Sequence, residues 1–210
     1  MPLWRSWCAH LQKSYGMKPE YADGATPLDP DEAAGLKLTH VATMKELNIF
    51  EQQNIQQAAA WAFGGREKDM LNQQYIRQLH KRMFGHVWKW AGEYRTSNKN
   101  IGVAREMIGI ELRQLCDDVA YWIAQATFPP DEIAARLHHR LVAIHPFSNG
   151  NGRHARLMAD VLLERKLNRP RFSWGGVGLV ASGDMRSAYI RALQAADCGD
   201  YAPLMQFVRS

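Results

Sequence analysis

A glycine-rich turn that opens a helix constrains this chain more than any other feature. Residues 144–156 read IHPFSNGNGRHAR, and an apolar run with helical spacing, Leu157 to Leu163, follows. Helix N-termini expose unpaired amide groups and carry partial positive charge, so they bind anions. Gly150 and Gly152 allow turn conformations and a close approach of the backbone to a ligand. The pattern predicts a phosphate-binding loop.

Charged side chains on both sides of the turn support this interpretation. Arg153 and Arg156 fall at the start of the helix, where the macrodipole disfavours cations, and a bound polyphosphate would reverse that penalty. His145 precedes the turn and can accept a proton at cellular pH. A glycine turn alone is usually only a turn, and a lone histidine is usually structural. Their combination at this spacing favours an anion site with a base beside it.

Length and composition favour one main domain. The 210 residues suit a domain over 31–210 with a partly irregular extension over 1–30. The net charge of +5 comes from scattered Lys and Arg, which fits an anionic ligand rather than nucleic acid. Cys8, Cys116 and Cys198 lie far apart, as in a reducing compartment. No stretch is long and apolar enough for a membrane span, so we expect a cytoplasmic protein.

Apolar residues recur at three- and four-residue spacing along most of the chain, which predicts an all-α bundle around one central helix pair. Thr43, with Glu46, and Asp131 are the expected N-caps of two of these helices. The expected helices cover about 43–63, 69–90, 105–125, 131–144, 152–167, 183–196 and 201–208. His40, His80 and His86 lie at no metal-ligand spacing and are expected at the core edge or the surface.

One segment departs from the helical pattern. Tyr94–Ala104 has a polar, turn-forming centre between β-compatible residues. It fits either a small β-hairpin flap or a plain surface loop.

The motif His145–Arg156 resembles the signature of the Fic (Fic/DOC) family, HPFx(D/E)GNGRxxR. Leu79–Arg95 resembles the family's lead-in to its flap, and Asp23–Asp29 resembles the bacterial subgroup called mobile mystery protein B. The resemblance implies a Fic-type helical bundle with a β-hairpin flap. It also implies a protein adenylyltransferase that transfers AMP from ATP to a Ser, Thr or Tyr hydroxyl of a target protein or of itself.

The resemblance assigns roles by position. His145 would be the general base, and Phe147 would pack under the loop. The anion hole and its cations would be Gly150, Asn151, Gly152, Arg153 and Arg156. The flap would hold the target by strand addition through Thr96, Ser97, Asn98, Lys99, Asn100, Ile101 and Gly102.

The match departs from the family pattern at the metal position. Asn149 replaces the acidic residue that binds Mg²⁺, and an amide oxygen could ligate Mg²⁺ or Mn²⁺ only without charge. A slow but active enzyme, an altered metal or nucleotide preference, and a degenerate enzyme all remain open. The alternative functions are a catalytically weak Fic module that binds nucleotide or a regulatory, antitoxin-like partner, and an enzyme that removes AMP.

Glu51 is a loose candidate for the glutamate that silences many Fic proteins. The family's inhibitory motif is [S/T]xxxE[G/N], whereas this chain has Leu47 and Gln52 at the flanking positions. In the family that glutamate pairs with the second loop arginine, so the expected partner is Arg156. The alternative is an ordinary carboxylate on a helix surface.

Overall fold

The computed structural model describes residues 33–38, 44–64, 69–176 and 183–210. Three expectations, the extension over 1–30, the subgroup-like segment Asp23–Asp29 and the Thr43 cap, lie outside these residues. Nearly all regular structure in the described part is helical, which confirms the all-α prediction. None of the described helices is both long and apolar enough to cross a membrane.

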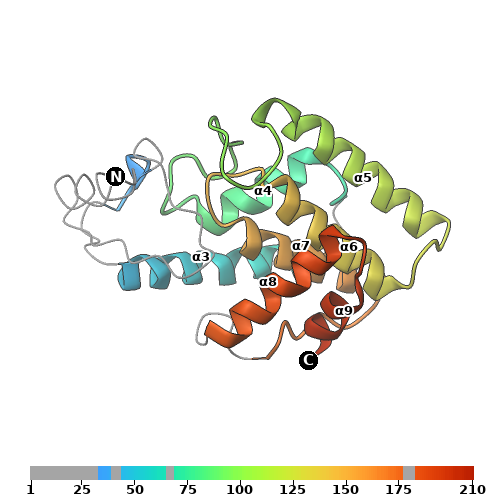
Figure 1. Cartoon of the computed structure of the whole chain (residues 1–210). Helices are drawn as coiled ribbons and strands as arrows, with labels where there is room; N and C mark the ends of the chain where they lie inside the picture. Colours follow the sequence, from blue (N-terminus) through green and yellow to red (C-terminus); the bar gives the residue numbers. More distant parts are fainter. Residues whose placement is uncertain (1–32, 39–43, 65–68, 177–182) are drawn as a thin grey trace.

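The helices follow one another along the chain, with a long connection over residues 85–104 between α4 and the turn before α5 (Figure 1). Their bounds are α3 Met44–Phe63, α4 Gln73–Phe84, the 3₁₀ turn η1 Arg105–Met107, α5 Ile108–Ala124, α6 Pro130–Ile144, α7 Asn151–Arg165, α8 Gly183–Asp197 and α9 Ala202–Arg209. The helix pair α6–α7 forms the centre. Helices α5 and α9 pack on α6, and α3 and α4 pack on α7.

Small apolar residues allow the central pair to pack closely. Ala134 and Ala135 of α6 and Ala155 and Ala159 of α7 are completely buried. Larger apolar side chains from every neighbouring helix fill the space around them. The two ends that matter for function, the end of α6 and the start of α7, are therefore fixed by the core.

The expected helix over 69–90 ends early. Helix α4 stops at Phe84, where Gly85 donates its amide to Lys81 O at 2.7 Å. The chain then forms an isolated antiparallel bridge between Leu36 and Trp88. The local sequence does not predict this bridge, because an apolar residue such as Trp88 fits the apolar stripe of a helix as well as it fits a β-bridge.

The expected β-hairpin over 94–104 is wrong for the described structure, because these residues form bends and irregular backbone without a strand. The alternative, a surface loop, is what the structure shows. Both ends of the loop are attached to the neighbouring motif instead. The Arg95 amide donates to Pro146 O at 2.9 Å, and the Val103 amide donates to Ile144 O at 3.3 Å.

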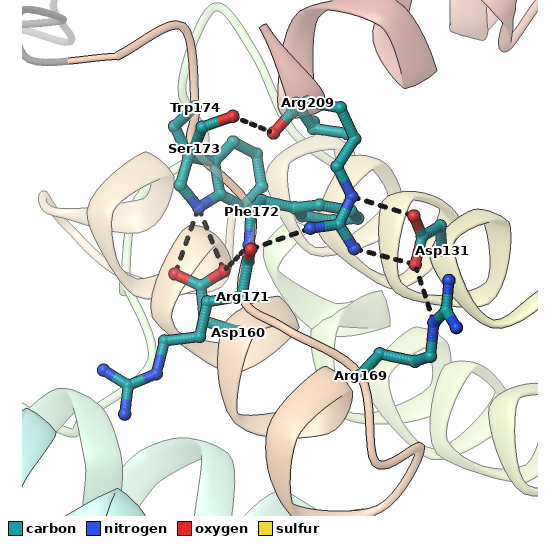
Figure 2. Close-up of polar contacts among 9 residues, drawn as sticks. Asp131, Asp160, Arg169, Arg171, Phe172, Ser173, Trp174 and Arg209 are labelled. Atoms are coloured by element: carbon teal, nitrogen blue, oxygen red, sulfur yellow. Dashed lines mark hydrogen bonds and ion pairs between the residues drawn. The ribbon is translucent and has the colours of Figure 1, made fainter.

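A polar cluster fastens the C-terminal part of the chain to the central pair (Figure 2). Arg209 of α9 forms two 2.8 Å hydrogen bonds with Asp131 in the first turn of α6. Asp131 is therefore not the N-cap predicted from the sequence; Pro129 is, and its fixed φ suits that entry. Asp160 of α7 accepts hydrogen bonds from the Phe172 amide and the Trp174 indole. Burial raises the pKa of Asp160 to about 6.

Candidate active site

The loop between α6 and α7 has a backbone that only certain residues tolerate. His145 caps α6 in the left-handed conformation, at φ 53° and ψ 58°. Gly150 caps α7 at φ 78°, and a Cβ added there would lie 2.6 Å from the Phe84 ring. No side chain caps α7, and its first helical hydrogen bond runs from His154 N to Gly150 O. The amides of residues 151–153 therefore stand at an uncapped, electropositive helix start.

Gly152 leaves space at this helix start. The nearest heavy atom to a Cβ built there is the Tyr189 hydroxyl, at 4.0 Å. Asn151, by contrast, uses its side chain inside the loop. Its amide group donates to Phe147 O at 2.8 Å and accepts from Phe147 N at 2.9 Å. Asn151 can therefore contribute to an anion hole through its backbone amide, while its side chain holds the loop in shape.

His80 supports the loop from α4, a role that the sequence analysis missed. It is completely buried, and its ring stacks on Phe147 with 3.7 Å between centroids. Nδ1 accepts from Gly92 N, so Nε2 carries the proton and donates to Asn149 O at 3.0 Å. Burial lowers the pKa of His80 well below its ordinary value, so it stays neutral. Its position four residues after buried Ile76 was the available signal, because the two share a helix face.

His145 is buried beside the 94–104 loop. Its side chain lies under Gly102 of the 94–104 loop, where an added Cβ would come within 2.8 Å of the His145 Cβ. Burial first, and then the cations of Arg95 and Lys99, lower the pKa of His145 to about 4, against a hydrogen bond with the Val142 backbone. The imidazole is therefore neutral at pH 7 and able to accept a proton.

The two loop arginines point to different neighbours. Arg153 forms a 2.5 Å ion pair with Glu51 of α3 and lies over the Phe84 ring. Arg156 lies over the Tyr189 ring of α8 and forms no ion pair with a carboxylate of the described residues. Burial lowers the pKa of Arg156. Of the two guanidinium groups, Arg156 is the one whose charge is not already matched by a carboxylate contact.

Glu51 does not pair with Arg156, the partner expected from the sequence. It is 4% exposed, and it divides its two oxygens between Arg153 and the Trp88 indole, at 2.5 and 2.6 Å. The alternative of a surface carboxylate is therefore wrong as well. The physical reason is the packing of α3 against α7, which places Arg153 toward α3, whereas Arg156 lies against α8.

Asn149 does not fit a metal ligand in this arrangement. Its side-chain oxygen accepts from Gly150 N at 2.6 Å and lies 3.4 Å from an Arg153 nitrogen. An uncharged oxygen that already accepts a hydrogen bond and faces a guanidinium is a poor site for Mg²⁺ or Mn²⁺. Within the described ranges, no group of three or more His, Cys, Asp or Glu side chains could hold a metal ion.

The loop of residues 96–102, expected to dock the target, lies at the surface beside His145. Several of its polar groups are already engaged. The Arg105 side chain donates to Thr96 O, and its amide donates to Asn98 Oδ1. Arg95 donates to Ser97 O. Docking of a target by this loop stays a prediction.

Comparison with known proteins identifies the domain. Residues 70–163 match the model of the Fic/DOC family. "Protein adenylyltransferase Fic" of Aedes aegypti is 32% identical over 146 residues, which is 68% of this chain and 28% of the relative. "Protein adenylyltransferase fic-1" of Caenorhabditis elegans is 29% identical over 151 residues, 68% of this chain and 27% of the relative. The chain thus spans about a quarter of the curated relatives that it matches.

Solved structures agree on the fold. A chain of Fic-1 from C. elegans aligns at 25% identity with a TM-score of 0.59, covering 76% of this chain and 48% of that chain. The BepC effector of Bartonella tribocorum, solved with bound AMPPNP, aligns at 20% identity with a TM-score of 0.61, covering 95% and 96%. The chain carries a Fic/DOC family domain over residues 70–163, which contains α4, the 94–104 loop and most of α7. The resemblance to mobile mystery protein B stays a prediction.

Proposed function

We propose that this chain is a protein adenylyltransferase that transfers AMP from ATP to a hydroxyl side chain of a target protein. One observation carries the proposal: a neutral, buried His145 directly precedes the uncapped start of α7, where backbone amides and Arg156 can receive phosphates. The activity named for the relatives and the AMPPNP bound to the BepC effector support it.

The reaction follows from these groups. His145 takes the proton of a Ser, Thr or Tyr hydroxyl, whose oxygen forms a bond to the α-phosphorus of ATP. The bond from that phosphorus to the β-phosphate oxygen breaks, and pyrophosphate leaves. The open amides of Asn151 and Gly152 and the Arg156 guanidinium stabilise the charge on the transferring group. The Gly150 amide, predicted as part of the anion hole, donates to Asn149 Oδ1 instead. No step of this reaction uses a metal ion held by the protein, because Asn149 is a poor metal ligand here.

Glu51 acts as an internal inhibitor in this proposal. Its carboxylate occupies Arg153, the other cation that phosphates would need, and the buried Trp88 indole holds the carboxylate in place. Because α3 belongs to the same chain, this contact needs no separate antitoxin partner. Removing the carboxylate frees Arg153 for the nucleotide.

The test is transfer of label from α-labelled ATP to protein in a cell lysate, including self-modification. We expect Glu51→Gly to raise transfer at least about tenfold, the effect of about 1.4 kcal/mol on the barrier, and His145→Ala to abolish it. Glu111→Gln is the matched control, because Glu111 forms a 2.7 Å ion pair with Arg140, away from the loop. Equal transfer by wild type and Glu51→Gly would contradict the inhibitory role.

Other outcomes of the same assay would favour the alternatives. Nucleotide binding without transfer by any variant would identify a binding module. Release of AMP from a previously modified protein, lost in Glu51→Gln, would identify an AMP-removing enzyme that uses this carboxylate as a base.

A further inference from the structure

Arg95 forms hydrogen bonds with both the 94–104 loop and His145. Its side chain comes from the start of the 94–104 loop and is 3% exposed. The guanidinium donates from Nε to His145 O at 2.8 Å, from Nη1 to Ser97 O at 2.8 Å and from Nη2 to Val103 O. A buried cation is costly unless its donors are satisfied, so these bonds fix both the arginine and the carbonyl groups it holds.

At His145, the hydrogen bonds of Arg95 reach a strained backbone that other residues must hold in place. His145 adopts the left-handed conformation, which is strained for a non-glycine residue and persists only where the surroundings impose it. Arg95 forms two hydrogen bonds just after the His145 Cα. Its side chain holds His145 O, and its own amide donates to the next carbonyl, Pro146 O, at 2.9 Å. These two hydrogen bonds hold the backbone that carries the imidazole.

The other end of the network is the loop itself. Arg95 holds carbonyl groups near both ends of the 96–102 segment, those of Ser97 and Val103. Gly102 packs directly against both residues, because a Cβ added there would lie 2.8 Å from the His145 Cβ and 2.9 Å from Arg95 Nη2. The loop, the guanidinium and the backbone of the base therefore form one packed unit.

We infer that Arg95 is a positioning residue that couples the loop of residues 96–102 to His145, so that the loop conformation that receives a target also sets the orientation of the base. This inference rests on the proposed function. Arg95 touches neither nucleotide nor acceptor in the proposed reaction and acts through His145. Its planar, forked guanidinium matters because an ammonium group cannot bond three diverging carbonyls in the same geometry.

The experiment compares Arg95→Lys with Arg105→Lys. Arg105 holds the same loop, because its side chain donates to Thr96 O and its backbone amide donates to Asn98 Oδ1. Its other side-chain hydrogen bond is with Glu106. The first readout needs no activity: NMR titration of the ¹⁵N-labelled His145 imidazole, assigned with His145→Ala. The second is the rate of label transfer from α-labelled ATP to lysate protein at saturating ATP, together with the KM for ATP. Thermal unfolding reports whether each variant folds.

We expect Arg95→Lys to shift the His145 resonances and their titration, whereas Arg105→Lys leaves them as in wild type. The transfer rate should fall about 100-fold in Arg95→Lys, the effect of misplacing a catalytic group by about 1 Å, with the KM for ATP little changed. Should Arg95→Lys not fold, Gly102→Ala displaces the same contacts from the loop side and should give the same two changes.

Two results would overturn the inference: His145 signals in the folded variant that match wild type, or equal losses in Arg95→Lys and Arg105→Lys. A Glu51→Gly protein that transfers no label under any condition would instead refute the proposed function. In that case the NMR comparison still decides whether Arg95 positions His145.

Discussion

At the scale of single residues, the surroundings of His145 define its chemistry. The ordinary pKa of a histidine lies near 6.5, and burial together with Arg95 and Lys99 lowers that of His145 to about 4. The imidazole is thus available as a base over the whole physiological range. A polyphosphate at the start of α7 would bring negative charge nearby and favour the imidazolium form that proton transfer creates.

A titration tests this description of His145. In the ligand-free protein we expect the imidazole to remain neutral down to about pH 5, and a non-hydrolysable ATP analogue should raise its pKa. The ¹⁵N chemical shifts of His145 as a function of pH measure both values. A ligand-free pKa at or above 6.5 would contradict the burial and the cationic neighbours assigned to this side chain.

At the scale of elements, the start of α7 separates two glycines that look equivalent in sequence. Gly150 has φ 78° and lies against the Phe84 ring, whereas Gly152 is the second residue of α7 and has open space beside it. The motif predicted both as parts of an anion hole. Gly150 is needed for its backbone conformation and its packing on Phe84, whereas Gly152 leaves space for a ligand. The sequence alone could not distinguish them, because Phe84 lies far away in the chain.

Alanine substitutions should divide these roles. Gly150→Ala should destabilise the protein by about 1–3 kcal/mol through backbone strain and the clash with Phe84. Gly152→Ala should keep or slightly raise stability, because alanine favours a helix by about 1 kcal/mol, yet weaken nucleotide binding. Thermal unfolding and calorimetric titration with ATP measure the two effects. Equal stability of both variants would refute the division.

At the scale of the whole molecule, apolar periodicity predicted the helical bundle and the motif predicted the phosphate-binding loop. Neither predicted the contacts between segments that are distant in sequence. The bridge of Leu36 with Trp88, the pairing of Glu51 with Arg153 and the support from His80 each join residues far apart in sequence. The predicted hairpin was wrong for a different reason, which lies within the loop. Side chains such as Arg95 satisfy the loop carbonyls, so a β-ladder is not needed to hold that segment.

Buried histidines should make the folded state sensitive to acid. Burial lowers the pKa of His138 to about 3 and those of His145 and His154 to about 4. The unfolded chain takes up protons below about pH 6.5 and the folded chain does not, so stability falls as pH drops from 6.5 toward 4. The raised pKa of Asp160, about 6, acts in the opposite direction and offsets part of this loss.

Each such histidine costs up to about 1.4 kcal/mol for every pH unit below 6.5. Urea unfolding at pH 7 and pH 5 measures the difference, and His145→Ala should show a shallower dependence than wild type. An unfolding midpoint that is unchanged or higher at pH 5 would show that these side chains are not buried as neutral groups.

The central claim is that AMP moves from ATP to a protein hydroxyl by way of His145. Its most direct test is incubation of Glu51→Gly and the double variant Glu51→Gly/His145→Ala with ATP labelled at either the α- or the γ-phosphate. The account predicts protein-bound label from α-labelled ATP only, and none with the double variant. Label from γ-labelled ATP, or α-label that persists without His145, would contradict it.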